Sequence, residues 1–284
     1  MASGMSRISG STPVHTARGR GADFVHSTAF EVLSRAGFVA RGLIYGIIGL
    51  LAFKVAVSDT GKLTNQQGAV KTVANQPFGE LLLLLLAIGL GGYAIWRLFR
   101  AALGRGPEDS DGTLERIGGF GSGLVYAGLC LVTIKLLTGS STAGGPSSRP
   151  DRTTAGVFEW PAGRWLVGAA GLVLLGVAAY QLVKGARQKF LEELKTEGMS
   201  ARTKAWLTRI GSVGHIARAI VFGLVGWFLL KAAYEFDAKE AIGLDGALTK
   251  VLNAAYGPWL LGLMAVGLIA FGLYSVAEAR YRRI

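Results

Sequence analysis

The sequence has 284 residues, of which 51% are hydrophobic and 17% are charged. Water-soluble domains usually carry about 25% charged residues, so this composition argues against a soluble enzyme or a soluble binding domain. The formal charge is +12, but the positive residues flank apolar segments, so we expect no nucleic-acid partner. The single cysteine, Cys130, excludes an intramolecular disulfide.

Six apolar segments follow one another along the chain, and each approaches the ~20 residues that a helix needs to cross a bilayer. Only helices or closed barrels satisfy backbone polar groups in lipid, and these lengths are helical. We therefore predict an all-α, polytopic integral membrane protein with six transmembrane helices, near residues 37–57, 78–96, 117–137, 162–183, 213–234 and 257–277.

The N-terminal residues 1–33 are polar and basic, and they lack an apolar core of signal-peptide length, so we expect a disordered cytoplasmic arm. The first apolar segment is too long for a signal peptide, and we keep it as a spanning helix. The rest of the chain divides into three hairpins and one cytoplasmic amphipathic link, expected at 34–103, 116–187, 188–210 and 211–284.

The hairpins are copies of one unit. The stretch "RGLIYGIIGLLAFK" at 41–54 matches "SGLVYAGLCLVTIK" at 122–135 and "RAIVFGLVGWFLLK" at 218–231. Further on, "GAVKTVANQPFG" at 68–79 resembles "GALTKVLNAAYGPW" at 246–259, and the middle copy shortens this part after a flexible Ser/Gly/Pro-rich loop. The three tandem repeats are parallel, which suggests pseudo-threefold packing about an axis along the membrane normal.

The distribution of Lys and Arg predicts the orientation. The side that holds both termini carries 20 of the 30 basic residues, and acidic residues divide almost evenly. The positive-inside rule then places the N- and C-termini in the cytoplasm of a bacterium, with the protein in the inner (cytoplasmic) membrane.

These motifs, taken in order, resemble the bacterial membrane family named domain of unknown function 1206, over about residues 35–280. The middle copy departs from the pattern at Ser122, where the other two copies have Arg, and in its shorter outer loop. The resemblance implies a polytopic membrane protein. It supplies neither an activity nor catalytic residues.

Arg41 and Arg218 occupy one slot of the repeat, a turn or more inside their helices. The interpretation we favour is snorkelling, in which the guanidinium reaches lipid phosphates along the helix surface. The alternative is that both arginines point inward and bind an anionic headgroup or an acidic partner, because the guanidinium fork pairs well with phosphate. They are the lipid- or anion-binding candidates.

Other recurring residues favour structural roles. Lysines and tyrosines at the ends of the spans are expected to be interfacial anchors: Lys54, Lys135, Lys231, Tyr93, Tyr180 and Tyr274. Small residues at four-residue spacing are expected to allow close helix packing, with homodimerisation as the rival: Gly42, Gly46, Gly119 and Gly123.

The cytoplasmic link contains a second amphipathic pattern. Ser200 can cap a helix in which Thr203, Trp206, Leu207 and Ile210 share one face. A helix lying on the anionic inner leaflet explains this pattern, and a docking site for a soluble partner is the alternative.

Catalytic chemistry is not indicated. The three histidines are scattered, no helix carries paired metal ligands, and Glu80 is the acidic residue closest to the middle of a span. We expect no catalytic residues, no metal and no cofactor. The leading hypothesis is a structural or accessory membrane protein that binds lipid, a membrane-protein partner or a second copy. A small channel or permease along the repeat axis is the alternative, and a membrane-embedded enzyme is the third.

Overall fold

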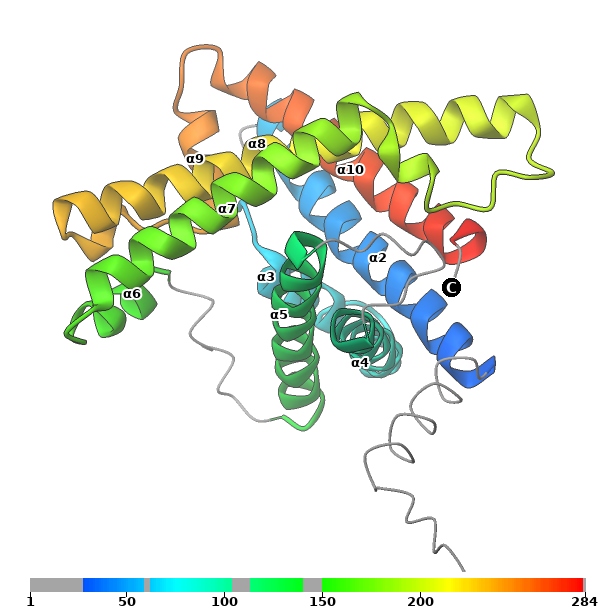
Figure 1. The fold of residues 1–284 in the computed structure, drawn as a ribbon, viewed down its shortest axis with the longest axis horizontal. Helices are drawn as coiled ribbons and strands as arrows, with labels where there is room; N and C mark the ends of the chain where they lie inside the picture. Colours follow the sequence, from blue (N-terminus) through cyan, green and yellow to red (C-terminus); the bar gives the residue numbers. More distant parts are fainter. Residues whose placement is uncertain (1–27, 59–61, 104–112, 140–149, 283–284) are drawn as a thin grey trace, which may run out of the picture.

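The computed structural model describes residues 28–58, 62–103, 113–139 and 150–282 (Figure 1). Within these ranges the chain is helical, and its strand-like pairing is one isolated bridge between Leu194 and Arg282. Six of its helices are long and apolar enough to cross a membrane, which confirms the predicted all-α architecture: α2 (Thr28–Ser58), α4 (Gly79–Leu103), α5 (Thr113–Leu137), α7 (Gly163–Ala186), α8 (Ala201–Glu235) and α10 (Gly257–Tyr281).

A short helix precedes the second long helix of each repeat: α3 (Gln66–Ala74), α6 (Pro150–Phe158) and α9 (Leu244–Leu252). The turn that follows requires glycine. A Cβ on Gly79 or Gly257 would lie 2.1 or 1.7 Å from a carbonyl oxygen of the preceding turn, and one on Gly163 would lie 1.8 Å from another. The residues before the first two, Phe78 and Tyr256, adopt the left-handed conformation. The three glycines therefore mark equivalent points of the repeats.

The three repeats form a ring in which the second long helix of each repeat packs against the first long helix of the next. These pairs are α4 with α5, α7 with α8, and α10 with α2, so the last repeat closes onto the first. One contact recurs at matching positions. Arg35 of α2 donates to the carbonyls of Ala279 and Arg280 at the end of α10, and Arg116 of α5 donates to those of Ala101 and Ala102 at the end of α4.

Packing within a repeat is not equivalent in the three copies. Helix α2 packs on α4, and α8 packs on α10, whereas α5 and α7 of the middle repeat form no packed interface. Figure 1 shows α5 and α7 running in different directions. Only 22% of the apolar core of each of these two helices is buried, compared with 50–56% for α2, α4 and α10. The middle hairpin is therefore open.

Aromatic side chains fill the interface of each closed repeat. Phe38 of α2 meets the rings of Tyr93 and Trp96 edge-to-face, at centroid distances of 5.4 and 5.1 Å. His215 occupies the position of Phe38 in the third repeat and meets Phe271 and Tyr274 in the same way, at 5.6 and 5.2 Å. Because Tyr93 aligns with Phe271 and Trp96 with Tyr274, the rings confirm the repeat at the level of side chains.

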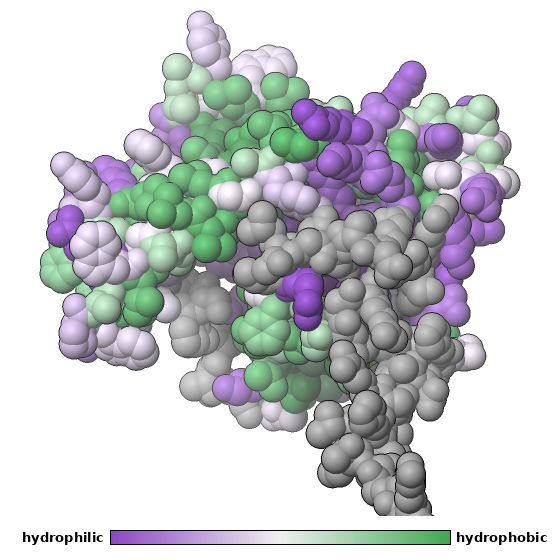
Figure 2. Space-filling view, in the orientation of Figure 1, coloured by the Kyte–Doolittle hydropathy of each residue, from purple (hydrophilic) through white to green (hydrophobic). Residues whose placement is uncertain are grey.

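The segment between α7 and α8 covers the end of the bundle at which α8 begins and α10 ends, called here the basic end. The ring of Phe190, in η2 (Lys189–Leu191), is fully buried and stacks on His215 at 5.0 Å. Leu194 is also buried, and the Lys195 amide donates to the Tyr281 carbonyl at 2.7 Å. Figure 2 shows hydrophilic side chains gathered at this end and hydrophobic ones over α7.

Two predicted segments differ from the structure. Helix α2 begins at Thr28, inside the expected arm 1–33, of which residues 1–27 lie outside the described residues. The expected link 188–210 is not a separate surface helix, because α8 runs without a break from Ala201 to Glu235. Ser200 caps this helix as predicted, accepting from the Thr203 amide at 3.1 Å. The Ser/Gly/Pro-rich loop falls mainly on residues 140–149, outside the described residues, and α6 follows it.

Candidate functional site: two equivalent arginines

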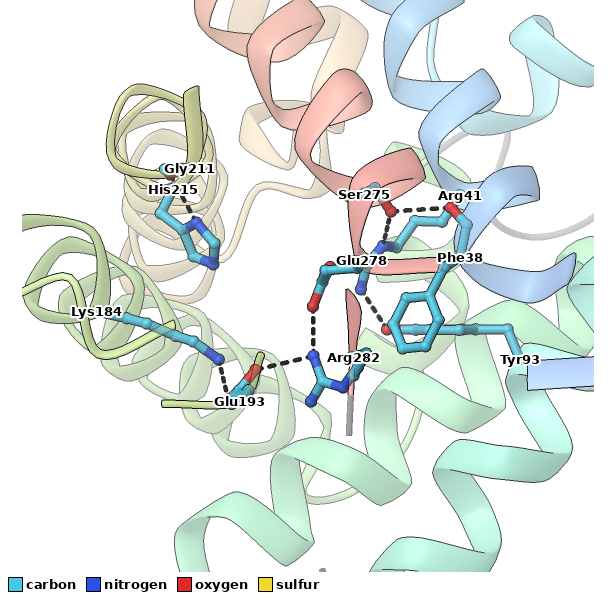
Figure 3. Close-up of polar contacts among 10 residues, drawn as sticks. All are labelled: Phe38, Arg41, Tyr93, Lys184, Glu193, Gly211, His215, Ser275, Glu278 and Arg282. Atoms are coloured by element: carbon cyan, nitrogen blue, oxygen red, sulfur yellow. Dashed lines mark hydrogen bonds and ion pairs between the residues drawn. The ribbon is translucent and has the colours of Figure 1, made fainter. Parts of the chain in front are cut away.

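Arg41 lies in the interior of the bundle, with only 5% of its surface exposed. Its Nε donates to Ser275 Oγ at 2.7 Å, its Nη1 donates to Tyr93 Oη at 2.5 Å, and its Nη2 forms an ion pair with Glu278 (Figure 3). Ser275 in turn donates to the Phe38 carbonyl at 3.0 Å. Three elements of two repeats thus hold one guanidinium in a fixed orientation.

Aromatic rings surround the same guanidinium. The Arg41 Cζ lies 5.0–5.2 Å from the ring centroids of Phe38, Tyr93 and Phe271. A snorkelling arginine keeps its head in the headgroup region, which these contacts exclude. Snorkelling, the favoured interpretation from sequence, is therefore wrong for Arg41. The residue is a neutralised structural cation.

Glu278 is the acidic residue that sequence reasoning missed. It appeared to be one of several charges that follow the last span, yet only 2% of its surface is exposed. Its second oxygen accepts from Arg282, which also pairs with Glu193 at 2.8 Å, and Glu193 pairs with Lys184. The result is a chain of five alternating charges across α2, α10, the α7–α8 segment and α7 (Figure 3).

Glu193 and Arg282, the two members of this chain between Glu278 and Lys184, stay ionised. Burial by itself would raise the pKa of Glu193, but the neighbouring charges of Arg282 and Lys184 outweigh it and hold that pKa well below its ordinary value. Burial opposes the charged form of Arg282, and the carboxylates of Glu193 and Glu278 outweigh it, so the pKa of Arg282 is raised. The chain therefore fastens the α7–α8 segment to the end of α10 throughout the physiological pH range.

Arg218 occupies the same slot of the repeat as Arg41 but has different partners. Its Cζ lies over the rings of Phe271, Phe222 and Tyr45, at 4.3, 4.9 and 5.0 Å. Among the described residues, no carboxylate pairs with it and no side chain hydrogen-bonds to it, and its Nε is fully buried without a partner. Its charge is stabilised by ring faces alone.

The cause lies in the residues that replace the partners of Arg41. The second helices can be aligned at the glycines with which they begin, Gly79, Gly163 and Gly257. In this alignment Gln181 of α7 is equivalent to Ser275 of α10, and Lys184 is equivalent to Glu278. Phe271 stands at the position of Tyr93 and lacks its hydroxyl. Each acceptor of the first site is thus lost or replaced, and the carboxylate is replaced by a cation.

The two sites also differ in access. Along the centre-facing side of α2, Arg41, Tyr45 and Ile48 are at most 5% exposed. At the equivalent positions of α8, Arg218, Phe222 and Val225 are half-buried. The third copy of the slot holds the small, uncharged side chain of Ser122, which is also half-buried. The arginine without an acidic partner is therefore also the more exposed of the two.

The expected interfacial anchors divide into two groups. Lys54 and Lys135 are exposed at the ends of α2 and α5, and Tyr180 is 46% exposed. Lys231 forms an ion pair with Glu240 at 3.0 Å. Tyr93 and Tyr274 are only 1% exposed and belong to the aromatic core, so the prediction that they are anchors is wrong. The tyrosine hydroxyl suggested a position at the membrane–water interface, whereas the hydroxyl of Tyr93 accepts a hydrogen bond from Arg41 inside the bundle.

The glycines expected to allow close packing also differ from one another. A Cβ on Gly42 would lie 2.7 Å from the Gly272 carbonyl oxygen of α10, and Gly119 and Gly123 face α4. Gly46 has open space at its Cβ position. Cys130 packs beside α4, where its Sγ lies 3.3 Å from the Ala87 carbonyl oxygen. Among the described residues, no group of three His, Cys, Asp or Glu side chains could hold a metal ion.

Together, the fold and the site define a polytopic all-α membrane protein built from three tandem repeats, with one neutralised and one unneutralised arginine between them. Comparison with known proteins gives the family. The model of the family described as Domain of Unknown Function (DUF1206) matches three times, at residues 36–104, 117–188 and 213–282. The chain belongs to this family.

A curated relative agrees with this assignment. The chain is 34% identical over 253 residues to "Uncharacterized protein YxxB" of Bacillus subtilis (strain 168), a match that covers 88% of this chain and 90% of the relative. No solved structure matches the chain.

Proposed function

We propose that this protein is a non-enzymatic accessory protein of the bacterial inner membrane that holds an anionic lipid headgroup at Arg218. The observation that carries the proposal is the contrast between two arginines in one slot of the repeat. Arg41 has a carboxylate and two hydroxyls as partners, and Arg218 has only aromatic rings. The family and the relative name no activity, so the proposal rests on this site.

The energetics favour a negatively charged ligand. Removing a cation from water is costly unless an opposite charge or a set of acceptors compensates it. Ring faces contribute only about 0.5–2 kcal/mol each and accept no strong hydrogen bond. A phosphate fits the planar guanidinium with two parallel hydrogen bonds. Gln181, which is buried at 7% exposure beside this site, can donate a further hydrogen bond from its amide.

The rival functions receive less support. A channel along the repeat axis needs a continuous polar path, but the central layer contains the Arg41–Glu278 ion pair and the packed rings of Phe38, Tyr93 and Tyr126. A membrane-embedded enzyme has less support, because among the residues described for this chain no group of three His, Cys, Asp or Glu side chains comes together. Binding is the function that an unneutralised, partly accessible cation supports.

Orientation is part of the proposal. The basic end of the bundle would face the cytoplasm, where the inner leaflet carries anionic lipids. Reporters fused at residues 1 and 284 should then behave as cytoplasmic, and a reporter inserted near Gly144 should appear outside. A C-terminus on the outer side would contradict this orientation.

The test of the headgroup site is native mass spectrometry of protein extracted with phosphatidylglycerol. Arg218→Ala should reduce the retained anionic lipid by about tenfold or more, because charge-assisted hydrogen bonds are lost. Arg218→Lys should retain part of the binding, since an ammonium keeps the charge but not the fork. Arg209→Ala is the matched control, because it removes the same charge from the exposed surface of α8. Equal lipid retention by the Arg218→Ala and Arg209→Ala proteins would contradict the proposal.

A further inference from the structure

We propose that the open middle repeat is the side entrance of this site, and that the groove between α5 and α7 holds the hydrocarbon chain of the lipid whose headgroup binds Arg218. The inference rests on the proposed function and names the path and the class of ligand. The ligand is an anionic membrane lipid that enters from the bilayer, and not a free anion that enters from water.

The closed repeats define what is missing in the middle one. In repeat 1, Gly37 packs on Tyr93, and Ala40 packs on Gly89. In repeat 3, Gly214 packs on Phe271, and Ala217 packs on Gly267. These contacts close each hairpin at its centre. The equivalent residues of the middle repeat are Gly118 and Gly121 on α5, with Val173 and Val177 on α7.

Gly118 and Gly121 have the small size that closure requires, but Val173 stands where the closed repeats have Gly89 and Gly267. A Cβ on Gly267 would lie 2.3 Å from the Cβ of Ala217, so this contact requires glycine. Val125 of α5 is 59% exposed, whereas its equivalents Ile44 and Val221 are each 1% exposed. Val173 of α7 is 60% exposed, although its equivalents Gly89 and Gly267 are buried. The Val173 side chain therefore does not fit the contact that closes the other two hairpins, and the facing surfaces of this hairpin stay exposed.

The exposed surfaces also offer unfilled volume. A Cβ placed on Gly118, Gly121 or Gly128 of α5, or on Gly176 of α7, would meet no atom within 4 Å. Spaced three or seven residues apart, the three glycines of α5 lie on one side of the helix with Val125. These positions therefore leave apolar surface of α5 and of α7 uncovered by the rest of the protein.

The groove leads to the unneutralised cation. Tyr126 of α5 has Tyr45, Tyr93, Arg41 and Arg218 as its titratable neighbours, so the inner edge of α5 borders the central layer. Across the opening, the centre-facing side of α8 is half-buried at Arg218, while the same side of α2 is sealed. On α5 the same slot holds the short side chain of Ser122, so α5 does not place an arginine at the centre as α2 and α8 do.

An apolar groove with one cation at its inner end matches a particular chemistry. A single-chain or double-chain lipid with a phosphate head satisfies both parts. A transmembrane helix of a partner, or a second copy of this chain, would have to place an acidic side chain opposite Arg218. We therefore commit to the lipid and treat the helix as an outcome that would overturn the inference.

Filling the groove is the first test. A Cβ at Gly121 meets no atom within 4 Å, so Gly121→Phe adds its ring to an open surface and should reduce retained phosphatidylglycerol about tenfold, to the level of Arg218→Ala. The matched control is Ile134→Phe, which alters a side chain of α5 that is 42% exposed and lies on another side of the helix. If Arg218→Ala loses lipid and Gly121→Phe keeps it, the entrance is wrong and the headgroup site stands. If neither loses lipid, both proposals fail.

Inorganic phosphate and a photoreactive lipid complete the test. Gly121→Phe should leave the binding of phosphate unchanged, because phosphate needs no chain groove; equal affinity for phosphate and lipid would overturn the inference. Phosphatidylglycerol with a diazirine in its acyl chain should label residues 113–137 and 163–186, and the Arg218→Ala protein should lose this labelling. Labelling confined to other helices, or a partner protein cross-linked in the groove, would overturn the lipid assignment.

Discussion

Arg41 and Arg218 occupy the same slot in two copies of one repeat, and both stack on aromatic rings in the centre of the bundle. The protein supplies an anion to the first and none to the second. The difference shows how a repeat protein can divide two tasks between equivalent positions. A cation with an internal carboxylate fastens helices together, whereas a cation without one is, in our proposal, the site of a ligand.

The hairpins around these arginines show a parallel difference. Repeat 1 and repeat 3 are closed by contacts at small residues, whereas the middle repeat lacks these contacts and has Val173 in place of a glycine. The opening lies in the repeat that has Ser122 in place of arginine. A symmetric ring of three closed hairpins would enclose its centre, so the unpacked hairpin is the place where we propose that the centre is reached from the bilayer.

The largest effect should follow removal of the internal anion. Glu278→Ala leaves Arg41 and Arg282 buried without this carboxylate, and breaking a buried pair in this way costs about 3–5 kcal/mol. Arg218→Ala breaks no ion pair and should cost much less. Equilibrium unfolding in mixed micelles measures both. Equal losses of unfolding free energy would remove the distinction between the two sites.

The next effect concerns the basic end. Glu193→Gln should lower the free energy of unfolding by roughly 1–3 kcal/mol at pH 7, because Arg282 and Lys184 lose a charged acceptor. The pKa of Glu193 is lowered in the folded state, so its contribution is present above the ordinary glutamate value of about 4.3 and is lost as the pH falls below it.

The pH dependence of this effect provides its control. The difference in stability between wild type and Glu193→Gln should be constant from pH 6 to 8 and should shrink in acid below about pH 4.3. A difference that instead grows as the pH falls would contradict the assigned direction of the pKa shift.

A smaller effect should appear when the second arginine receives an internal anion. Gln181→Glu places a carboxylate at the position that Ser275 has beside Arg41, with little change in volume. It should reduce retained anionic lipid about tenfold, as Arg218→Ala does, while leaving the protein as stable as wild type or more so. Native mass spectrometry and unfolding measure the two readouts. Unchanged lipid retention would mean that Arg218 is not the headgroup ligand.

The smallest effects test the threefold arrangement itself. Arg35 and Arg116 donate to equivalent carbonyls at the ends of α10 and α4. Each change to Ala should cost about 1 kcal/mol, and the two losses should be similar. Thermal unfolding of the two variants is the measurement. A loss confined to one of them would show that the two contacts are not equivalent.

The spans and the repeats could be predicted from the sequence because both are local patterns. Apolar length identifies each helix, and self-comparison aligns Arg41 with Arg218. The partners of these arginines could not be predicted in the same way. Glu278 and Ser275 lie more than 230 residues from Arg41, and they meet it only because α10 closes onto α2.

The error about Tyr93 and Tyr274 has another cause. Their positions near the ends of the spans suggested interfacial anchors, whereas the structure places both among buried rings. The open middle repeat does have a signal in the sequence, because Val173 stands where repeats 1 and 3 have a glycine. Its meaning could not be predicted, because it depends on the close contacts that Gly89 and Gly267 make in the folded protein.

The most direct measurement of the central claim is phosphorus–carbon dipolar dephasing by solid-state NMR, with arginine labelled at Cζ and the protein in bilayers containing phosphatidylglycerol. The Arg218 guanidinium should lie within hydrogen-bonding distance of a lipid phosphate, so phosphorus should dephase its Cζ signal. The Arg218→Lys variant assigns the signal, because this one dephased signal should be missing from its spectrum. The Arg41 signal should remain unaffected by phosphorus, because Glu278 occupies that place. An Arg218 signal without phosphorus dephasing, or dephasing of both signals, would contradict the account.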